Sequence, residues 1–304
     1  YRLVDKIGAG GMGEVWRAHH HALDREVAIK ILDRDKGVDP DAVARFEREA
    51  HTMSQLRHEN AVQIFDYGVT EDGLFYYAME LLEGEDLAET LMREGRIEPE
   101  RAVAWIRQAA EAVAEAHRAG IVHRDLKPEN LFVTKHDGHV AIKVLDFGLA
   151  RLIGDGGPNL TREGWAVGTP STVAPEIVLG EAADARSDVY ALGTVLYYAL
   201  TGTRPFEGEA TEMLRAKIKS DPPPPSARTD AWIPPHLEAV VMCCLARDPG
   251  ARYADAGELV HALTGCPMRG VSVEQEIWTW EDVTVVDALR ERRPEQRQAH
   301  RQAP

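Results

Sequence analysis

The sequence predicts an α+β fold of two lobes, a small mostly-β lobe followed by a larger mostly-α lobe. Two observations predict it: hydrophobicity alternates with the period of strands up to about residue 80, and apolar side chains recur with the period of helices from about residue 85. The composition, 44% hydrophobic and 28% charged over 304 residues, excludes a disordered or collagen-like chain. We expect a ligand to bind in the crevice between the two lobes.

The small lobe combines strands with one helix. The helix is expected from Pro40 to Leu56, because Asp39 can cap its start and proline suits the first helical position. Its apolar face repeats at three- and four-residue steps, through Val43, Phe46, Ala50, Met53 and Leu56. Strand-like alternation occupies residues 15–19, 26–32, 61–68 and 74–80.

The large lobe is built mainly from helices. One is expected from Pro99 to His117, with Gly120 as its stop. A second, from Ser187 to Thr201, is apolar nearly all round, so we expect it to be buried in the middle of the lobe. The prolines from Pro222 to Pro225 predict a loop between helices. Clear periodicity is lost after about Gly265.

Charge and cysteine content exclude several classes of partner. The net charge of −15 argues against nucleic acid or an anionic membrane surface as a partner. The longest nearly unbroken apolar run, Val189 to Leu200, is shorter than the roughly 18 residues of a membrane span, so none is expected within this chain. The three cysteines form a poor disulfide framework, and Cys243 and Cys244 are adjacent. We therefore expect a cytoplasmic protein in which these two cysteines pack in the core.

A glycine-rich segment lies near the start of the chain. Gly8, Gly10 and Gly13 form a G-x-G-x-x-G pattern followed by Val15, and a backbone without Cβ atoms can approach phosphates. A glycine-rich hairpin without a ligand and a dinucleotide-binding loop share this spacing. A dinucleotide loop should lead into a helix, whereas here two strand-like segments follow. The order of elements therefore favours a hairpin loop over phosphates.

One lysine and one glutamate of the small lobe stand out. Lys30 ends the apolar strand segment Val27-Ala28-Ile29, where a lysine is unusual unless it meets a carboxylate or a phosphate. Glu49 lies on the only predicted helix of this lobe, next to its apolar face. Glu49 is therefore the expected partner of Lys30.

The most specific motif of the sequence lies in the large lobe. Residues 123–130 read HRDLKPEN, and Asp146-Phe147-Gly148 follows sixteen residues after Asn130. Asn130 and Asp146, on two adjacent connections, can supply oxygen ligands to Mg²⁺, which keeps room for nucleotide phosphates. Asp125 is then free to orient a hydroxyl.

With these motifs the chain resembles Hanks-type (eukaryotic-like) protein serine/threonine kinases, bacterial members in particular. The resemblance implies a two-lobed protein kinase fold over residues 1–264, with lobes of about 1–81 and 82–264, and a C-terminal extension over 265–304 that ends in an Arg-rich tail. It implies transfer of the γ-phosphate of ATP, with Mg²⁺, to Ser and Thr hydroxyls of protein substrates in signal transduction. The alternatives are a nucleotide-binding pseudokinase scaffold and a small-molecule kinase. The segment Ala174-Pro175-Glu176 disfavours the small-molecule kinase.

The resemblance also assigns roles to single residues. The three glycines would cover the ATP phosphates, Lys30 paired to Glu49 would bind the α- and β-phosphates, and Asp125 would be the catalytic base. Lys127 would neutralise the γ-phosphate, and together with Thr169 it indicates Ser/Thr rather than Tyr specificity. The adenine pocket would be lined by Ile7, Val15, Ala28, Met79, Glu80, Leu82 and Phe132.

Other residues of the motif set are expected to support the fold or the substrate. Asp188 would brace the catalytic loop, and Glu176 would pair with Arg252. Thr172 stands where the family usually has a Tyr, which puts the usual substrate preference in doubt. Glu129 and Asp86 would meet basic residues upstream of the acceptor, unless both are simply solvated.

Regulation is expected through a phosphate on the segment between Asp146 and Glu176. Arg124, Arg151 and Arg45 could converge on it, and Thr161 is the best acceptor, which implies autophosphorylation and a possible kinase dimer. Thr169, Ser171 and Thr172 are weaker acceptors, and Glu163 could instead pair with Arg124.

The Arg-rich tail is expected to be a linker, either to a soluble domain or beside a membrane helix beyond Pro304. The run from His19 to His21 is expected to be solvated rather than to bind metal.

Overall fold

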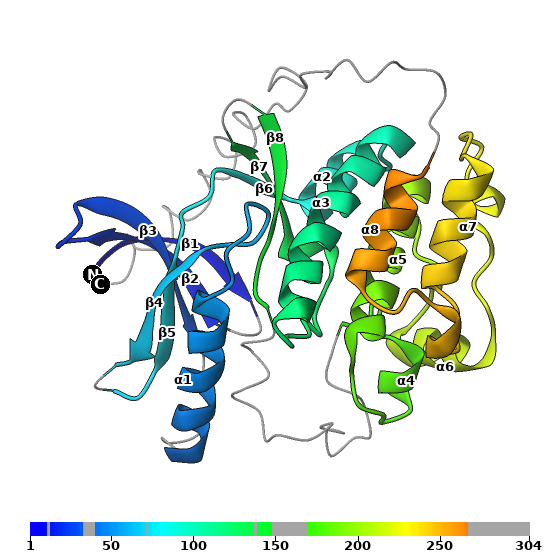
Figure 1. Ribbon diagram of the computed structural model, residues 1–304. Coiled ribbons are helices and arrows are strands. Elements are labelled where there is room, and N and C mark those ends of the chain that lie inside the picture. The colour runs from blue at the N-terminus through cyan, green and yellow to red at the C-terminus, as the bar shows by residue number, and fades with distance from the viewer. Residues whose placement is uncertain (11–12, 33–39, 71, 137–138, 148–168, 267–304) are drawn as a thin grey trace, which may run out of the picture.

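The computed structural model describes residues 1–10, 13–32, 40–70, 72–136, 139–147 and 169–266 (Figure 1). Its first lobe is a five-stranded antiparallel sheet in the order β1-β2-β3-β5-β4, with one helix packed against it. The elements are β1 (Arg2–Gly10), β2 (Gly13–His20), β3 (Arg25–Leu32), α1 (Pro40–Ser54), β4 (Ile64–Val69) and β5 (Phe75–Met79). The predicted mostly-β lobe with one helix is confirmed.

The alternation of side chains explains how this sheet buries both faces in part. Val27 and Ile29 of β3 pack with Ala18 and Ala78 in a small cluster on one face. Ala28 and the remaining inward residues of β3 and β5 join α1 in the main core on the other face. Successive residues of a strand point to opposite faces, so the apolar run of β3 supplies both clusters.

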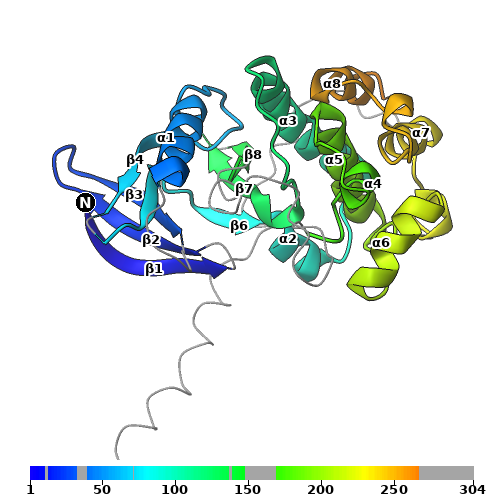
Figure 2. The same cartoon turned by 90° about the horizontal axis from the view of Figure 1, so that it is seen from below.

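The second lobe is mostly helical, and a three-stranded sheet lies between it and the first lobe (Figures 1 and 2). Its strands are β6 (Gly84–Asp86), β7 (Leu131–His136) and β8 (His139–Val144). The helices of the second lobe are α2 (Leu87–Glu94), α3 (Pro99–Arg118), α4 (Pro175–Val178), α5 (Ala185–Thr201), α6 (Ala210–Lys219), α7 (Pro235–Cys244) and α8 (Ala256–Thr264). Short 3-10 turns cover Pro128–Asn130, Pro225–Ala227 and Pro249–Ala251. The predicted fold class, a two-lobed protein with a helical second lobe, is confirmed.

Helix α5 is the centre of the second lobe, as its all-round apolarity predicted. Asp184 caps its start in a reciprocal box with Ser187, and Gly202 ends it in the left-handed conformation at φ 72°. Within it, a Cβ on Gly193 would lie 2.3 Å from the Cβ of Cys244, so only glycine allows α7 to approach so closely. This contact explains why Cys244 is fully buried.

Helix boundaries differ from the sequence predictions by one or two residues. The first helix ends at Ser54 rather than Leu56, and α3 continues to Arg118. Gly120 follows at φ 75°, in the conformation that favours glycine after a helix. Pro225 begins a short 3-10 turn instead of lying in the loop. No helix in the described residues is long and apolar enough to cross a membrane.

Candidate active site

The loop from His123 to Asn130 is held in place by one buried carboxylate, that of Asp188. Asp188, at the start of α5, accepts the backbone N–H of His123 at 2.7 Å and that of Arg124 at 2.8 Å. The Nε2 of His117 lies 2.9 Å from the same carboxylate. Arg124 has φ 68°, a conformation unfavourable for a residue with a Cβ, and the hydrogen bond from its backbone N–H helps to hold it. The expected bracing by Asp188 is therefore present.

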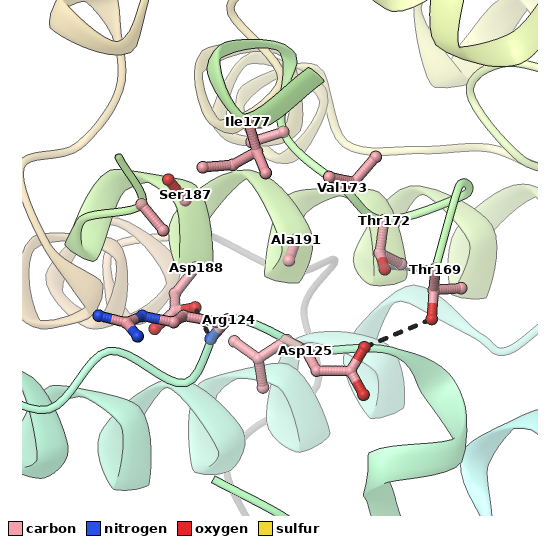
Figure 3. A pocket seen from close by; sticks show the side chains of 12 residues that line it. Arg124, Asp125, Thr169, Thr172, Val173, Ile177, Ser187, Asp188 and Ala191 are labelled. Atoms are coloured by element: carbon pink, nitrogen blue, oxygen red, sulfur yellow. Dashed lines mark hydrogen bonds between the residues drawn. The ribbon is translucent and has the colours of Figure 1, made fainter. Parts of the chain in front are cut away.

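Asp125 is surrounded by donors at the mouth of the loop. Its carboxylate accepts Lys127 Nζ at 2.8 Å and Asn130 Nδ2 at 3.2 Å, and Asn130 also donates to the Asp125 carbonyl at 2.7 Å. The Thr169 hydroxyl makes a longer contact of 3.4 Å with its other carboxylate oxygen (Figure 3). The structure thus brings four predicted residues together, around a carboxylate able to accept a proton.

A second centre joins the two lobes through Asp146. Lys30 and Tyr77 face each other across β3 and β5. Lys30 Nζ donates to one oxygen of Asp146, and the Tyr77 hydroxyl donates to the other. Burial acts to raise the pKa of Asp146, but the charge and hydrogen bond of Lys30, the Tyr77 hydroxyl and the charge of His123 bring it below its usual value. Asp146 is therefore held as a carboxylate.

The structure describes a partner of Lys30 that the sequence analysis did not name. Its described partner is Asp146, whereas the side chain of Glu49 lies outside what the structure describes, so the Lys30–Glu49 pair stays a prediction. Tyr77 was missed by the sequence analysis. Burial and the Asp146 charge raise its pKa well above the usual tyrosine value, so it remains a hydrogen-bond donor. Its position opposite Lys30 follows only from the strand register.

The glycine-rich segment lies at the turn of the β1–β2 hairpin. Gly8 pairs with Val15 and Gly10 with Gly13, so strands, and not a helix, flank the loop. Gly13 has φ 130°, and a Cβ there would lie 2.0 Å from the Ile31 carbonyl oxygen. The strand pairing agrees with the hairpin reading. Within the described residues of this segment, Gly13 is a position whose backbone requires glycine.

The residues expected around adenine lie on the strands and the connection between the lobes. Ala28 and Met79 are buried and pair across β3 and β5, while Ile7 is exposed. Val15, Leu82 and Phe132 are half-buried. The Glu80 carboxylate accepts the backbone N–H of Gln63 at 2.8 Å and Lys143 Nζ at 2.8 Å. Lys143, also missed from the sequence, thereby fixes the start of this connection.

The predicted Glu176–Arg252 pair is present. Two guanidinium nitrogens of Arg252 lie 2.9 and 2.8 Å from the Glu176 oxygens, and the Ser187 hydroxyl donates at 2.7 Å. Burial acts to raise the pKa of Glu176, but the Arg252 hydrogen bonds and charge, with that hydroxyl, lower it below its usual value. The pair ties α4 to the turn before α8.

A small pocket lies between the loop of residues 123–130 and α5 (Figure 3). Arg124 and Asp125 form one wall, Ala191 of α5 lies behind, and Thr172 and Val173 come from the opposite segment. Thr172 is buried, which agrees with its being a weaker phosphate acceptor than an exposed residue. The pocket opens beside the Asp125 carboxylate.

The regulatory residues are only partly described. Arg124 is exposed, and its guanidinium forms no ion pair with any described residue. Thr161, Glu163 and Arg151 lie outside the described residues, as does the side chain of Arg45, so their convergence stays a prediction.

The histidine run makes no metal cluster within the described part of the chain, and His19 contacts Asp24 at 3.0 Å. All three cysteines are free; Cys244 is buried, whereas Cys243 is only half-buried.

Comparisons with known proteins agree with this geometry. The family model described as "Protein kinase domain" matches residues 1–263. The serine/threonine-protein kinase pkn3 of Myxococcus xanthus is 42% identical over 261 residues, which cover 84% of this chain and 48% of that protein. PknB of Mycolicibacterium smegmatis is 41% identical over 263 residues, which cover 85% and 41%. The chain thus spans about half, or less, of the length of these curated relatives. A crystal structure of the Mycobacterium tuberculosis PknI kinase domain superposes with TM-score 0.69 at 25% identity, covering 87% of this chain and 95% of that one.

Proposed function

The chain belongs to the protein kinase family, and on that premise we propose that it transfers the γ-phosphate of ATP to Ser and Thr hydroxyls of protein substrates. The observation that carries the proposal is the Asp125 carboxylate, which accepts a hydrogen bond from Lys127 and contacts Thr169. A pseudokinase scaffold is not favoured, because Lys30, Asp125 and Asp146 are all present.

The residues around Asp146, which we call the nucleotide side, suit a nucleotide with a divalent cation. Asp146 is a largely buried carboxylate with a lowered pKa, and Asn130 keeps its side-chain oxygen after donating its amide to Asp125. These oxygens would hold Mg²⁺, which neutralises phosphate charge when bound. Lys30 would bind the α- and β-phosphates, under the loop that begins at Gly8.

The acceptor side suits a hydroxyl. Asp125 would orient the Ser or Thr hydroxyl and take its proton as the new oxygen–phosphorus bond forms and the bond to ADP breaks. Lys127, 2.8 Å from Asp125, would place a positive charge beside the transferred phosphoryl group. Thr169 would anchor residues 169–174, which we call the acceptor platform, beside this carboxylate.

Acidic residues near the cleft support basic protein substrates. The pKa of Asp86 is raised by burial and by the negative charges of Glu89 and Glu129, although backbone hydrogen bonds oppose the rise. Glu129 is exposed, so this cluster of negative charge can meet an arginine or lysine of the substrate. We infer a preference for basic residues before the acceptor.

Domain limits and regulation complete the proposal. The kinase domain would end near Thr264, at the end of α8, with residues 265–304 as an extension. Autophosphorylation at Thr161 would switch activity, which the exposed Arg124 beside Asp125 supports. Phosphate transfer to a peptide and phosphorylation of Thr161 have separate readouts, so the two can be tested apart.

The test is phosphate transfer from radiolabelled ATP to a peptide library by the parent chain, by Asp125→Asn and by Asp221→Asn, a control on an exposed loop. We expect Asp125→Asn to lower turnover about a thousandfold and the control to match the parent. Near-parent turnover in Asp125→Asn contradicts the proposal. In the same reactions, no enrichment of Arg or Lys before the acceptor contradicts the basic preference, and no phosphate on Thr161 contradicts the switch.

A further inference from the structure

A buried lysine lies beneath the acceptor platform. Lys217, on α6, is only 1% exposed. Its Nζ donates to the carbonyl oxygens of Ser171 at 2.7 Å and Val173 at 2.8 Å. Helix α6 also packs against α4, which directly follows the platform (Figure 1). One side chain of α6 therefore contacts the backbone of the platform at two points.

The surroundings make this position costly for a charge. Lys217 Nζ lies 5.0 Å from the centre of the Tyr190 ring, and the Arg252 guanidinium lies 4.8 Å from the same ring. Burial and the charge of Arg252 lower the pKa of Lys217 to about 7, although Glu176 acts in the opposite direction. Lys217 forms no ion pair with any described residue. A methionine would fill similar volume without this cost.

What lysine supplies here, and an apolar residue cannot, is donors for two carbonyls. The platform is a tight turn in which the N–H groups of Thr172 and Val173 both lie 3.1 Å from the Thr169 carbonyl. Its own N–H groups therefore do not satisfy the carbonyls of Ser171 and Val173. An amine keeps two N–H donors even when it is neutral, so both bonds persist on either side of its pKa. Without them, two inward carbonyls lose their partner.

We propose that Lys217 is a positioning residue for the protein acceptor. By holding Ser171 and Val173, it fixes the platform so that Thr169 lies against Asp125 and Thr172 and Val173 cover the pocket beside it (Figure 3). This inference rests on the proposed kinase function, because it assigns a residue to acceptor binding. It predicts an effect on the acceptor and none on the nucleotide.

The test compares Lys217→Met with Lys219→Met, an exposed lysine two residues further along the same helix. We expect Lys217→Met to raise the KM for the peptide acceptor about tenfold and to leave the KM for ATP unchanged. Hydrogen exchange of the Thr172 and Val173 amides should become faster in Lys217→Met. Lys219→Met should match the parent in all three measurements.

The exchange measurement needs no activity, so it tests the contact of Lys217 with the platform even if the chain phosphorylates no peptide. Absence of peptide phosphorylation would overturn the kinase function alone. Parent-like acceptor KM and exchange in Lys217→Met overturn the inference. An equal rise of both KM values also overturns it, because it indicates a general effect on the fold. If Lys217→Met does not fold, Lys217→Arg keeps N–H donors, and a tenfold rise of its acceptor KM would then contradict the inference.

Discussion

The nucleotide side and the acceptor side of the candidate active site are held together in different ways. On the nucleotide side, Asp146 is bound by Lys30 and Tyr77, which both come from the sheet of the other lobe. On the acceptor side, the catalytic loop is bound by Asp188, and the segment after the platform is bound by Arg252, both within one lobe. The first set of contacts joins the lobes, and the second belongs to the core of a single lobe.

This difference determines what a substitution should change. Breaking a buried ion pair inside a lobe leaves a charge without a partner and reduces the stability of that lobe. Removing the neutral Tyr77 donor from Asp146 costs less than leaving a buried charge unpaired, because the charge of Lys30 still faces the carboxylate. We therefore expect loss of the Glu176–Arg252 ion pair to appear in unfolding measurements and loss of the Tyr77 hydroxyl to appear in ATP binding.

The largest effect on stability is expected for Glu176→Gln. The substitution leaves Arg252 buried without a carboxylate partner, and the free energy of unfolding should fall by about 3 kcal/mol in urea titrations. Glu181→Gln is the control, since Glu181 is exposed and close in sequence. A loss as small as that of the control would show that the pair contributes little.

The pH dependence of this effect has a definite sign. Because the pKa of Glu176 is lowered from 4.5 in the folded chain, the contribution of the carboxylate is complete above pH 4.5. It is lost as the pH falls through the lower, folded-state pKa. The difference in unfolding free energy between parent and Glu176→Gln should therefore shrink on acidification below pH 4.5, and a difference that grows there would contradict the assignment.

A smaller effect, on ATP, is expected for Tyr77→Phe. The variant removes the hydroxyl that donates to Asp146 but leaves Lys30 in place. With one oxygen less firmly oriented, the KM for ATP should rise about threefold while the acceptor KM stays unchanged. Tyr76→Phe is a matched control, because Tyr76 is the preceding residue on β5 and points to the opposite face. Equal KM values in parent and Tyr77→Phe would remove Tyr77 from the nucleotide side.

The sequence predicted those parts of the molecule that are encoded by local pattern. Helix α5 was found because its residues are apolar nearly all round, and it is indeed buried. Asp125, Asn130 and Asp146 were found because they stand in fixed motifs. The residues that hold the site and its surrounding segments were predicted less completely: Asp188 and Arg252 belong to motifs, whereas Tyr77 and Lys217 do not.

The missed residues have a common physical reason. Tyr77 reaches Asp146 only because β3 and β5 pair in the register that sets it opposite Lys30. Lys217 lies in the last turn of the amphipathic helix α6, where a lysine side chain ordinarily extends into solvent. Its burial depends on how α6 packs against the acceptor platform. Register and packing between distant segments leave no local signal in the sequence.

The separation of the two sides is tested most directly by nucleotide-induced stabilisation. The thermal unfolding midpoints of the parent, Asp125→Asn and Asp146→Asn are measured with and without saturating ATP and Mg²⁺. We expect a rise of about 5 °C for the parent and for Asp125→Asn, and little or none for Asp146→Asn. If Asp125→Asn loses the rise together with Asp146→Asn, or if Asp146→Asn keeps it in full, the nucleotide and acceptor sides are not separate as the account requires.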